Sequence, residues 1–137
     1  MRKRYAVAAS ESVEPHTITD CDEEWLIVSE LPDHAHDYEA LIELDAPTVT
    51  PLFTDYGFTS FNGRVYLYES LVTAFTIVAF NKVETDMFLL QLEEYMIAQE
   101  QTIYYIAKHH QPLLEKTAAT YRVAIHIFDL DKYRKND

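Results

Sequence analysis

The sequence predicts an α+β fold in which one antiparallel sheet carries two helices on one face. Two patterns support this class: runs of alternating apolar and polar residues, and a long segment with apolar residues at helical spacing. Their order along the chain matches the split βαβ, ferredoxin-like topology. The length of 137 residues and an apolar content of 48% fit one folded domain. We therefore expect a single compact domain over 1–137, with loose basic ends at 1–4 and 131–137.

The first elements include one ambiguous segment. Residues 4–10 predict a short edge strand, and 23–31 predict a buried strand that ends before Pro32. Residues 33–45 fit either a helix, with their apolar side chains in one stripe, or a strand, in which only Leu41 breaks the alternation of apolar residues and carboxylates. We favour the helix.

The middle of the chain has clearer signals. Residues 50–58 predict a short helix, with a capping threonine, a proline in the first turn and Gly57 as the left-handed residue after its end. Asn62–Gly63 lies between two β-type runs and predicts a hairpin, whose second strand presents Tyr66 and Tyr68 on one face. Residues 71–80 are rich in β-branched and aromatic side chains and predict a further strand.

The longest predicted helix spans 85–109. Its apolar residues recur at spacings of three and four, and Pro112 ends or kinks it. The stripe is typical of a helix packed on a sheet, and a homodimer through this helix is the alternative. Alternating residues at 121–130 predict the last strand.

Several functional classes are excluded by composition. The chain has two glycines, so glycine-rich phosphate-binding loops are absent, and we expect no cofactor. Its one cysteine, Cys21, excludes internal disulfides and paired-cysteine metal sites. The longest apolar stretch, 70–80, is too short to span a bilayer, and no signal peptide is recognisable. We expect a cytoplasmic protein.

The charge distribution is the most unusual feature of the sequence. The net charge is −12, and the segment from Tyr5 to Gly63 holds 13 carboxylates without a single lysine or arginine. Nucleic acids and anionic membranes bind through basic residues, so this segment disfavours both as direct partners. It favours a basic protein surface, approached under electrostatic attraction.

Histidines offer a competing interpretation. His34 and His36 lie two residues apart among carboxylates. This spacing places both side chains on one side of a strand but on different sides of a helix. These two histidines are candidates for a metal site, but weak ones, because the sequence contains no recognised spacing of metal ligands. The alternative hypothesis is a small histidine/carboxylate enzyme, possibly metal-dependent.

The leading hypothesis is a protein-binding inhibitor that is not an enzyme. Its carboxylates would mimic the phosphates of a nucleic acid and mask the basic surface of a partner, which we expect to be a nucleic-acid-binding enzyme, as anti-restriction, anti-CRISPR or polymerase-inhibitor proteins do. An immunity protein for a basic toxin or an acidic secretion chaperone belongs to the same physical class. The predicted partner-binding residues are Glu23, Glu24, Asp33, Asp37, Glu39, Glu43, Asp45 and Asp55.

Overall fold

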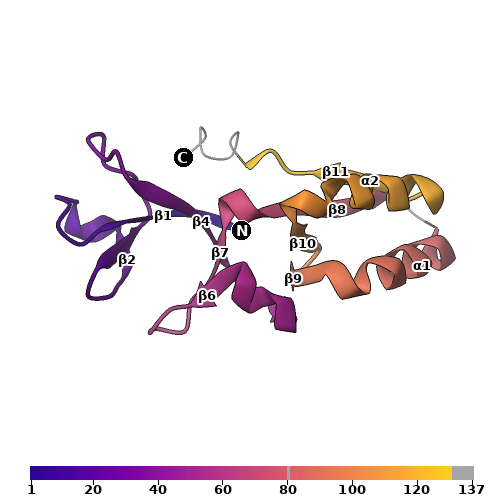
Figure 1. The fold of residues 1–137 in the computed structure, drawn as a ribbon, viewed down its shortest axis with the longest axis horizontal. Coiled ribbons are helices and arrows are strands. Elements are labelled where there is room, and N and C mark those ends of the chain that lie inside the picture. Colours follow the sequence, from indigo (N-terminus) through magenta and orange to yellow (C-terminus); the bar gives the residue numbers. More distant parts are fainter. Residues whose placement is uncertain (80, 131–137) are drawn as a thin grey trace.

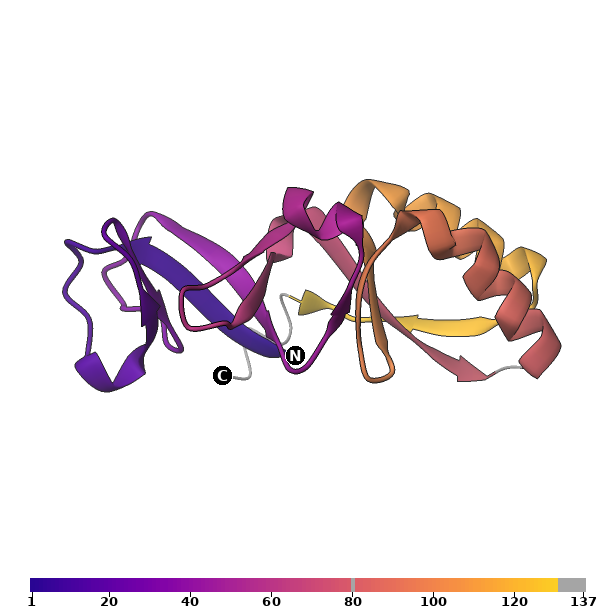
Figure 2. The same cartoon turned by 90° about the horizontal axis from the view of Figure 1, so that it is seen from below.

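The computed structural model describes residues 1–79 and 81–130. Within these residues the chain forms two antiparallel sheets, and the α-helices lie at one end of an elongated molecule (Figures 1 and 2). The predicted α+β class is confirmed. The ferredoxin-like order is not found, because the strands divide between two sheets instead of forming one.

The first sheet has the spatial order β2-β3-β1-β4-β7-β6, with every neighbouring pair antiparallel. Its strands are β1 (Arg2–Ala8), β2 (Ile18–Cys21), β3 (Trp25–Val28), β4 (Tyr38–Leu44), β6 (Gly57–Thr59) and β7 (Val65–Tyr68). The edge strand predicted at 4–10 is therefore a central one, since β1 pairs with β3 and β4. The loose basic end predicted at 1–4 is also wrong: residues 2–4 belong to β1, and Lys3 is buried. The other predicted loose end, 131–137, lies outside the described residues.

The second sheet has the order β11-β8-β10-β9-β5. Its strands and the α-helices are β5 (Thr48–Val49), β8 (Val72–Ala79), β9 (Met96–Glu100), β10 (Ile103–Ala107), β11 (Ala124–Ile127), α1 (Lys82–Leu92) and α2 (Gln111–Thr120). Both helices cover one face, where Phe88 of α1 and Leu114 of α2 form a buried cluster with Phe75 of β8. Among the described residues, no helix has the length and apolar character needed to cross a membrane.

Short 3-10 helices connect several strands: η1 (Pro15–Thr17), η2 (Pro51–Asp55), η3 (Glu69–Leu71), η4 (Glu93–Tyr95) and η5 (Lys108–His110). The helix predicted at 50–58 corresponds to η2, and its threonine cap is confirmed by the Leu52 backbone N–H, which donates to Oγ1 of Thr50 at 3.3 Å. Gly57 does not have the predicted left-handed conformation and instead begins β6. The predicted hairpin is confirmed, with Gly63 at φ 82° in its turn.

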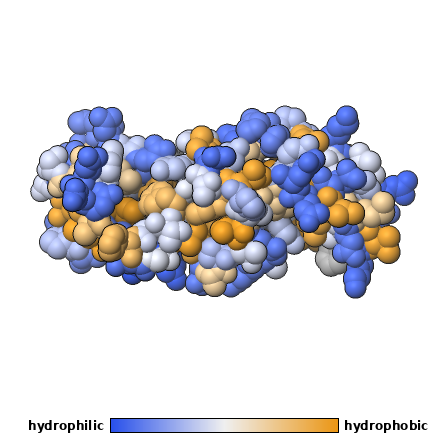
Figure 3. All heavy atoms as spheres, turned by 60° about the horizontal axis from the view of Figure 1, so that its bottom comes forward, coloured by the Kyte–Doolittle hydropathy of each residue, from blue (hydrophilic) through white to orange (hydrophobic). Residues whose placement is uncertain are grey.

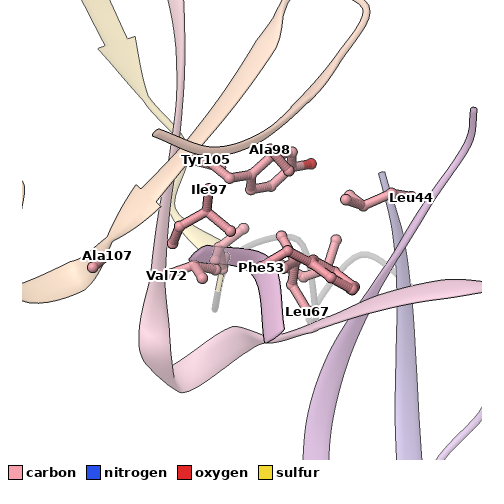
Figure 4. Packing of buried hydrophobic residues seen from close by; sticks show 11 residues of the cluster. Leu44, Phe53, Leu67, Val72, Ile97, Ala98, Tyr105 and Ala107 are labelled. Carbon is pink, nitrogen blue, oxygen red and sulfur yellow. The ribbon is translucent and has the colours of Figure 1, made fainter. Parts of the chain in front are cut away.

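A shared apolar core joins the sheets (Figure 4). Leu44 and Leu67 of the first sheet pack with Val72, Ile97 and Tyr105 of the second. All five side chains are at most 5% exposed. Burial of each apolar side chain of this kind stabilises the folded state by about 1.5–3 kcal/mol, so this cluster is a principal link between the two sheets.

Buried charges reinforce the same junction. The amino group of Met1 lies 2.8 Å from Oε1 of Glu100, whose Oε2 accepts a hydrogen bond of 2.6 Å from the backbone N–H of Asp45. Lys3 of β1 forms an ion pair with Glu69 of η3, and both side chains are nearly inaccessible. Because a buried charge requires a partner, these contacts restrict how the sheets meet.

The preferred helix at 33–45 is wrong, and the strand alternative is correct. Residues 38–44 form β4, which pairs with β1 on one side and with β7 on the other. Leu41, the one exception to the alternation, is fully buried on the face opposite Ile42. Both faces of this strand are thus partly apolar.

The predicted helix over 85–109 is also wrong, and the dimer through it loses its basis. Helix α1 begins three residues earlier than predicted and ends at Leu92. β9 and β10 follow as a hairpin whose two-residue turn contains Gln101 at φ 53°. Pro112 does not end a helix but lies in the first turn of α2. The last predicted strand is confirmed in a shorter form, as β11.

Candidate binding site

The first sheet curls so that its edge strand β2 meets β7 and the turn between β6 and β7. Asp20 of β2 accepts a hydrogen bond from the hydroxyl of Tyr66 on β7. It also accepts one from Nδ2 of Asn62 at 2.6 Å and one from the guanidinium of Arg64 at 3.3 Å. We call these four residues the Asp20 clamp. Because the clamp bridges opposite edges of the sheet, the face that carries Asp20 and Tyr66 is concave.

The clamp stabilises a buried charge. Burial by itself raises the pKa of Asp20, but the hydrogen bonds from Tyr66, Asn62 and Ser60 and the charge of Arg64 outweigh it and hold this pKa below its ordinary value. Burial and the hydrogen bond to Asp20 raise the pKa of Tyr66. At neutral pH the carboxylate is therefore ionised and the hydroxyl protonated, an arrangement that fixes the curl of the sheet.

An aromatic pocket of about 490 Å³ opens on the same concave face. Its walls include the rings of Trp25 from β3, Phe58 from β6 and Tyr68 from β7. The rings of Phe58 and Tyr68 lie 5.7 Å apart, and Trp25 is 42% exposed. The other lining residues are apolar or acidic: Ala6, Asp22, Ile27, Glu39 and Leu41. This volume lies within the range of small-ligand sites.

Exposed carboxylates concentrate on the part of the chain that forms the end of the molecule opposite the helices (Figures 1 and 2). We call this set the acidic end: Glu14, Asp22, Glu23, Glu24, Glu30, Asp33, Asp37 and Glu39. Asp22 and Glu39 also line the aromatic pocket. On one face of the molecule, hydrophobic residues reach the surface along the middle and hydrophilic residues border them (Figure 3).

The structure brings five of the eight predicted partner-binding residues into the acidic end and separates the other three from it. Glu43 is mostly buried, and its carboxylate lies 3.1 Å from Nε of Arg4 and 3.8 Å from the guanidinium of Arg2. It is thus engaged within the sheet and is not displayed as predicted. Asp45 follows β4 at the junction of the sheets, and Asp55 ends η2; both are exposed.

The two histidines do not act as a pair. Nε2 of His34 lies 3.1 Å from a carboxylate oxygen of Glu11. His36 instead lines a pocket of about 690 Å³ at the junction of the sheets, which we call the junction pocket. Its polar lining includes Glu39, Glu69 and Lys108. Within residues 1–79 and 81–130, no group of three or more histidine, cysteine or carboxylate side chains is arranged to hold a metal ion.

No protein-family model, curated protein or solved structure matches this chain.

Sequence reasoning missed the aromatic pocket, whose walls come from three separate strands. Trp25 directly follows Glu23 and Glu24 in the sequence, and its run of apolar residues predicts only a buried strand. Two signals were present. Tyr68 shares a strand face with Tyr66, and Leu41 interrupts an otherwise regular alternation. The side chains of Tyr68 and Leu41 lie on the concave face, and together they indicate that this face is apolar.

Proposed function

We propose that the protein is a small cytoplasmic binding protein that masks a basic surface of a partner, with a nucleic-acid-binding protein as the expected partner class. The observation that carries this proposal is the acidic end: eight exposed carboxylates in a stretch of chain without lysine or arginine. Surfaces of ordinary soluble domains intersperse charges of both signs. A one-sign surface attracts an oppositely charged partner and accelerates association at low ionic strength.

The expected mechanism is competition. The carboxylates of the acidic end would occupy lysine and arginine side chains that otherwise contact phosphates, so the partner would release its nucleic acid. Such binding weakens with salt, because the screening length falls from about 10 Å at 0.1 M to about 3 Å at 1 M. An immunity protein or an acidic chaperone would use the same attraction, and the identity of the captured partner distinguishes these roles.

The test compares two charge-reversal variants with the wild type. The first replaces Glu23, Glu24, Asp33 and Asp37 with lysine. The control variant replaces Asp86, Glu93, Glu94 and Glu115, which are equally exposed but lie near the helices. Each variant changes the net charge by +8, so nonspecific electrostatics are matched. Circular dichroism and thermal unfolding establish that both variants remain folded.

Each immobilised protein is exposed to cell lysate at low and high salt, and the retained proteins are then assayed for DNA and RNA binding with and without the free protein. We expect the wild type and the control variant to retain a nucleic-acid-binding protein at low salt and to displace its nucleic acid. The acidic-end variant should do neither. Equal loss in both variants, or retention that ignores salt, would refute the proposal.

A small histidine/carboxylate enzyme is the second candidate, because His36 lines the junction pocket beside Glu39 and Glu69. The matched pair is His36→Ala and His34→Ala, since His34 does not line this pocket. In a screen of hydrolytic substrates with and without divalent metals, an enzyme predicts activity that only His36→Ala abolishes. Absence of activity, or equal loss in both variants, counts against this candidate.

A further inference from the structure

The aromatic pocket has a chemistry that the acidic surface alone does not provide. Three of its eight lining residues are aromatic and two are carboxylates, and none of these described residues is lysine or arginine. Aromatic faces carry partial negative charge and attract cations, with greater strength where water is displaced. The carboxylates of Asp22 and Glu39 add full negative charges to the same lining. The pocket therefore complements a group that is both positively charged and able to displace water from aromatic surfaces.

An arginine side chain fits this description better than a lysine side chain does. The guanidinium is planar and weakly hydrated, so it stacks on aromatic rings and at the same time donates hydrogen bonds in its plane to carboxylates. A lysine ammonium is compact and strongly hydrated, so it loses more on entering an apolar pocket. The walls formed by Trp25, Phe58 and Tyr68 stand on strands from opposite sides of a curled sheet. This arrangement suits a flat group inserted between them.

One carboxylate of the pair is already positioned by the backbone. Oδ1 of Asp22 accepts hydrogen bonds from the backbone N–H groups of Glu24 and Trp25, at 2.8 and 2.7 Å. These bonds hold Asp22 in the turn that presents Trp25. Glu39 lies at the start of β4, where the backbone is paired with β1. Both acids thus stand on defined backbone, which favours recognition of one bound geometry.

We propose that the aromatic pocket receives an arginine side chain of the basic partner and is the specific anchor within an otherwise electrostatic interface. This inference rests on the proposed function, since it names the residue type that the acidic end delivers to the pocket. Buried aromatic–arginine contacts of this kind dominate binding energy where they occur, whereas rim charges contribute little each.

Trp25 is the single tryptophan of the chain, so its fluorescence reports directly on the pocket. The probe is a peptide of the form acetyl-GKGKG-X-GKGKG-amide, in which X is arginine, lysine or citrulline. The flanking lysines supply the charge that the acidic end attracts. Citrulline keeps the shape of arginine without its charge, and lysine keeps the charge without the plane. Affinity is measured by calorimetry, and tryptophan emission is followed in the same titration.

We expect the arginine peptide to bind about tenfold more tightly than the citrulline peptide and at least about threefold more tightly than the lysine peptide. Only the arginine peptide should shift or quench Trp25 emission. Two variants locate the effect. Tyr68→Leu removes a ring of the pocket, and Glu39→Gln removes a charge from its lining. Their controls are Phe61→Leu, on the same hairpin but fully exposed, and Glu24→Gln, which does not line the pocket. The pocket variants should lose the preference for arginine, and the controls should keep it.

The experiment distinguishes failure of the arginine anchor from failure of the electrostatic function proposed for the acidic end. Equal affinity for the three peptides, without a change in Trp25 emission, would overturn the arginine anchor even if salt-dependent binding to the acidic end persists. Conversely, suppose that the variant with Glu23, Glu24, Asp33 and Asp37 reversed binds the arginine peptide as the wild type does. The anchor then stands, and the electrostatic function proposed for the acidic end fails. If no peptide binds the wild type, the anchor is refuted.

Discussion

The Asp20 clamp yields the sharpest prediction about stability. Replacing Asp20 with alanine removes the acceptor shared by Tyr66, Asn62 and Arg64. The hydroxyl of Tyr66 has no access to solvent, because this residue is 0% exposed, so water cannot replace the lost acceptor. The variant should therefore unfold far more easily than one that loses a surface carboxylate.

The magnitude follows from the three bonds. A hydrogen bond to a charged group contributes about 1.5–3 kcal/mol, and a buried donor left without a partner costs about 1–3 kcal/mol. The contribution of Arg64 is small, since its side chain is 42% exposed and surface ion pairs contribute only about 0–1 kcal/mol. Contributions within one network are not additive. We expect Asp20→Ala to lower the free energy of unfolding by about 3–4 kcal/mol, a large share of the 5–15 kcal/mol typical of a domain.

Urea unfolding at pH 7, followed by circular dichroism, measures this quantity. Tyr66→Phe, which removes only the hydroxyl, should cost about 2 kcal/mol. The double variant should cost less than the sum of the single variants, because both remove the same bond. A loss below about 1 kcal/mol for Asp20→Ala, or strict additivity, would show that the clamp does not hold the sheet edges together.

The Asp20 clamp also predicts the pH range over which it stabilises the fold. The pKa of Asp20 is lowered on folding, so its contribution is complete above the unfolded value of about 4 and is lost as the pH falls below it. The pKa of Tyr66 is raised on folding, so its contribution is complete below about 10 and is lost as the pH rises further. The stability difference between wild type and Asp20→Ala should therefore be largest between these limits. A difference that stays constant from pH 2 to pH 11 would contradict this reasoning.

Three further substitutions test the packing. Gly57→Ala places a Cβ against the backbone carbonyl oxygen of Tyr66, so the hairpin backbone must shift. We expect the free energy of unfolding in urea to fall by about 3 kcal/mol. Gly63→Ala meets no neighbour but retains φ 82°, and it should cost only about 1 kcal/mol; equal costs at the two glycines would refute the steric explanation. Lys3→Met leaves Glu69 buried without its ammonium partner and should cost about 3–5 kcal/mol, measured by thermal unfolding, with partial recovery on adding Glu69→Leu. No recovery in that double variant would mean that lost packing, not the unpaired charge, causes the effect.

Local sequence signals located the elements that have one polar side or a distinctive turn. The hairpin at Asn62–Gly63 was predictable because glycine at positive φ is the ordinary residue of such turns. The hairpin between β9 and β10 was not, because its turn holds Gln101 at φ 53°, a conformation that is uncommon for residues other than glycine. Both of its strands are also buried on two sides, so they lack the alternation that identifies a strand. The apolar residues of these two strands then also fit the spacing of a helix, which is why the sequence predicts one over 85–109.

Leu41 illustrates why the candidate site was only partly predictable. Its position suggested a helix, because an apolar residue on the polar side of a strand is unexpected when only one face is buried. The curl of the sheet, which depends on contacts between residues more than 40 positions apart, creates a second apolar face for it. The acidic composition was visible in the sequence. The aromatic pocket beside it required the positions of β3, β6 and β7.

The structure also explains why the charge asymmetry of the sequence is a property of one end of the molecule. Two of the basic residues that flank the base-free segment are engaged away from the acidic end, Lys3 with Glu69 of η3 and Arg4 with Glu43 of β4. Arg64 pairs instead with Asp20 of β2. These three ion pairs do not involve any of the eight carboxylates that define the acidic end. Because eight carboxylates share in the field at the acidic end, loss of any one should change the attraction for a cation only slightly. A large effect of Glu39→Gln alone on arginine binding then points to direct contact with this carboxylate. Because Glu39 also lines the junction pocket, the accompanying loss of the Trp25 emission change is what assigns that contact to the aromatic pocket.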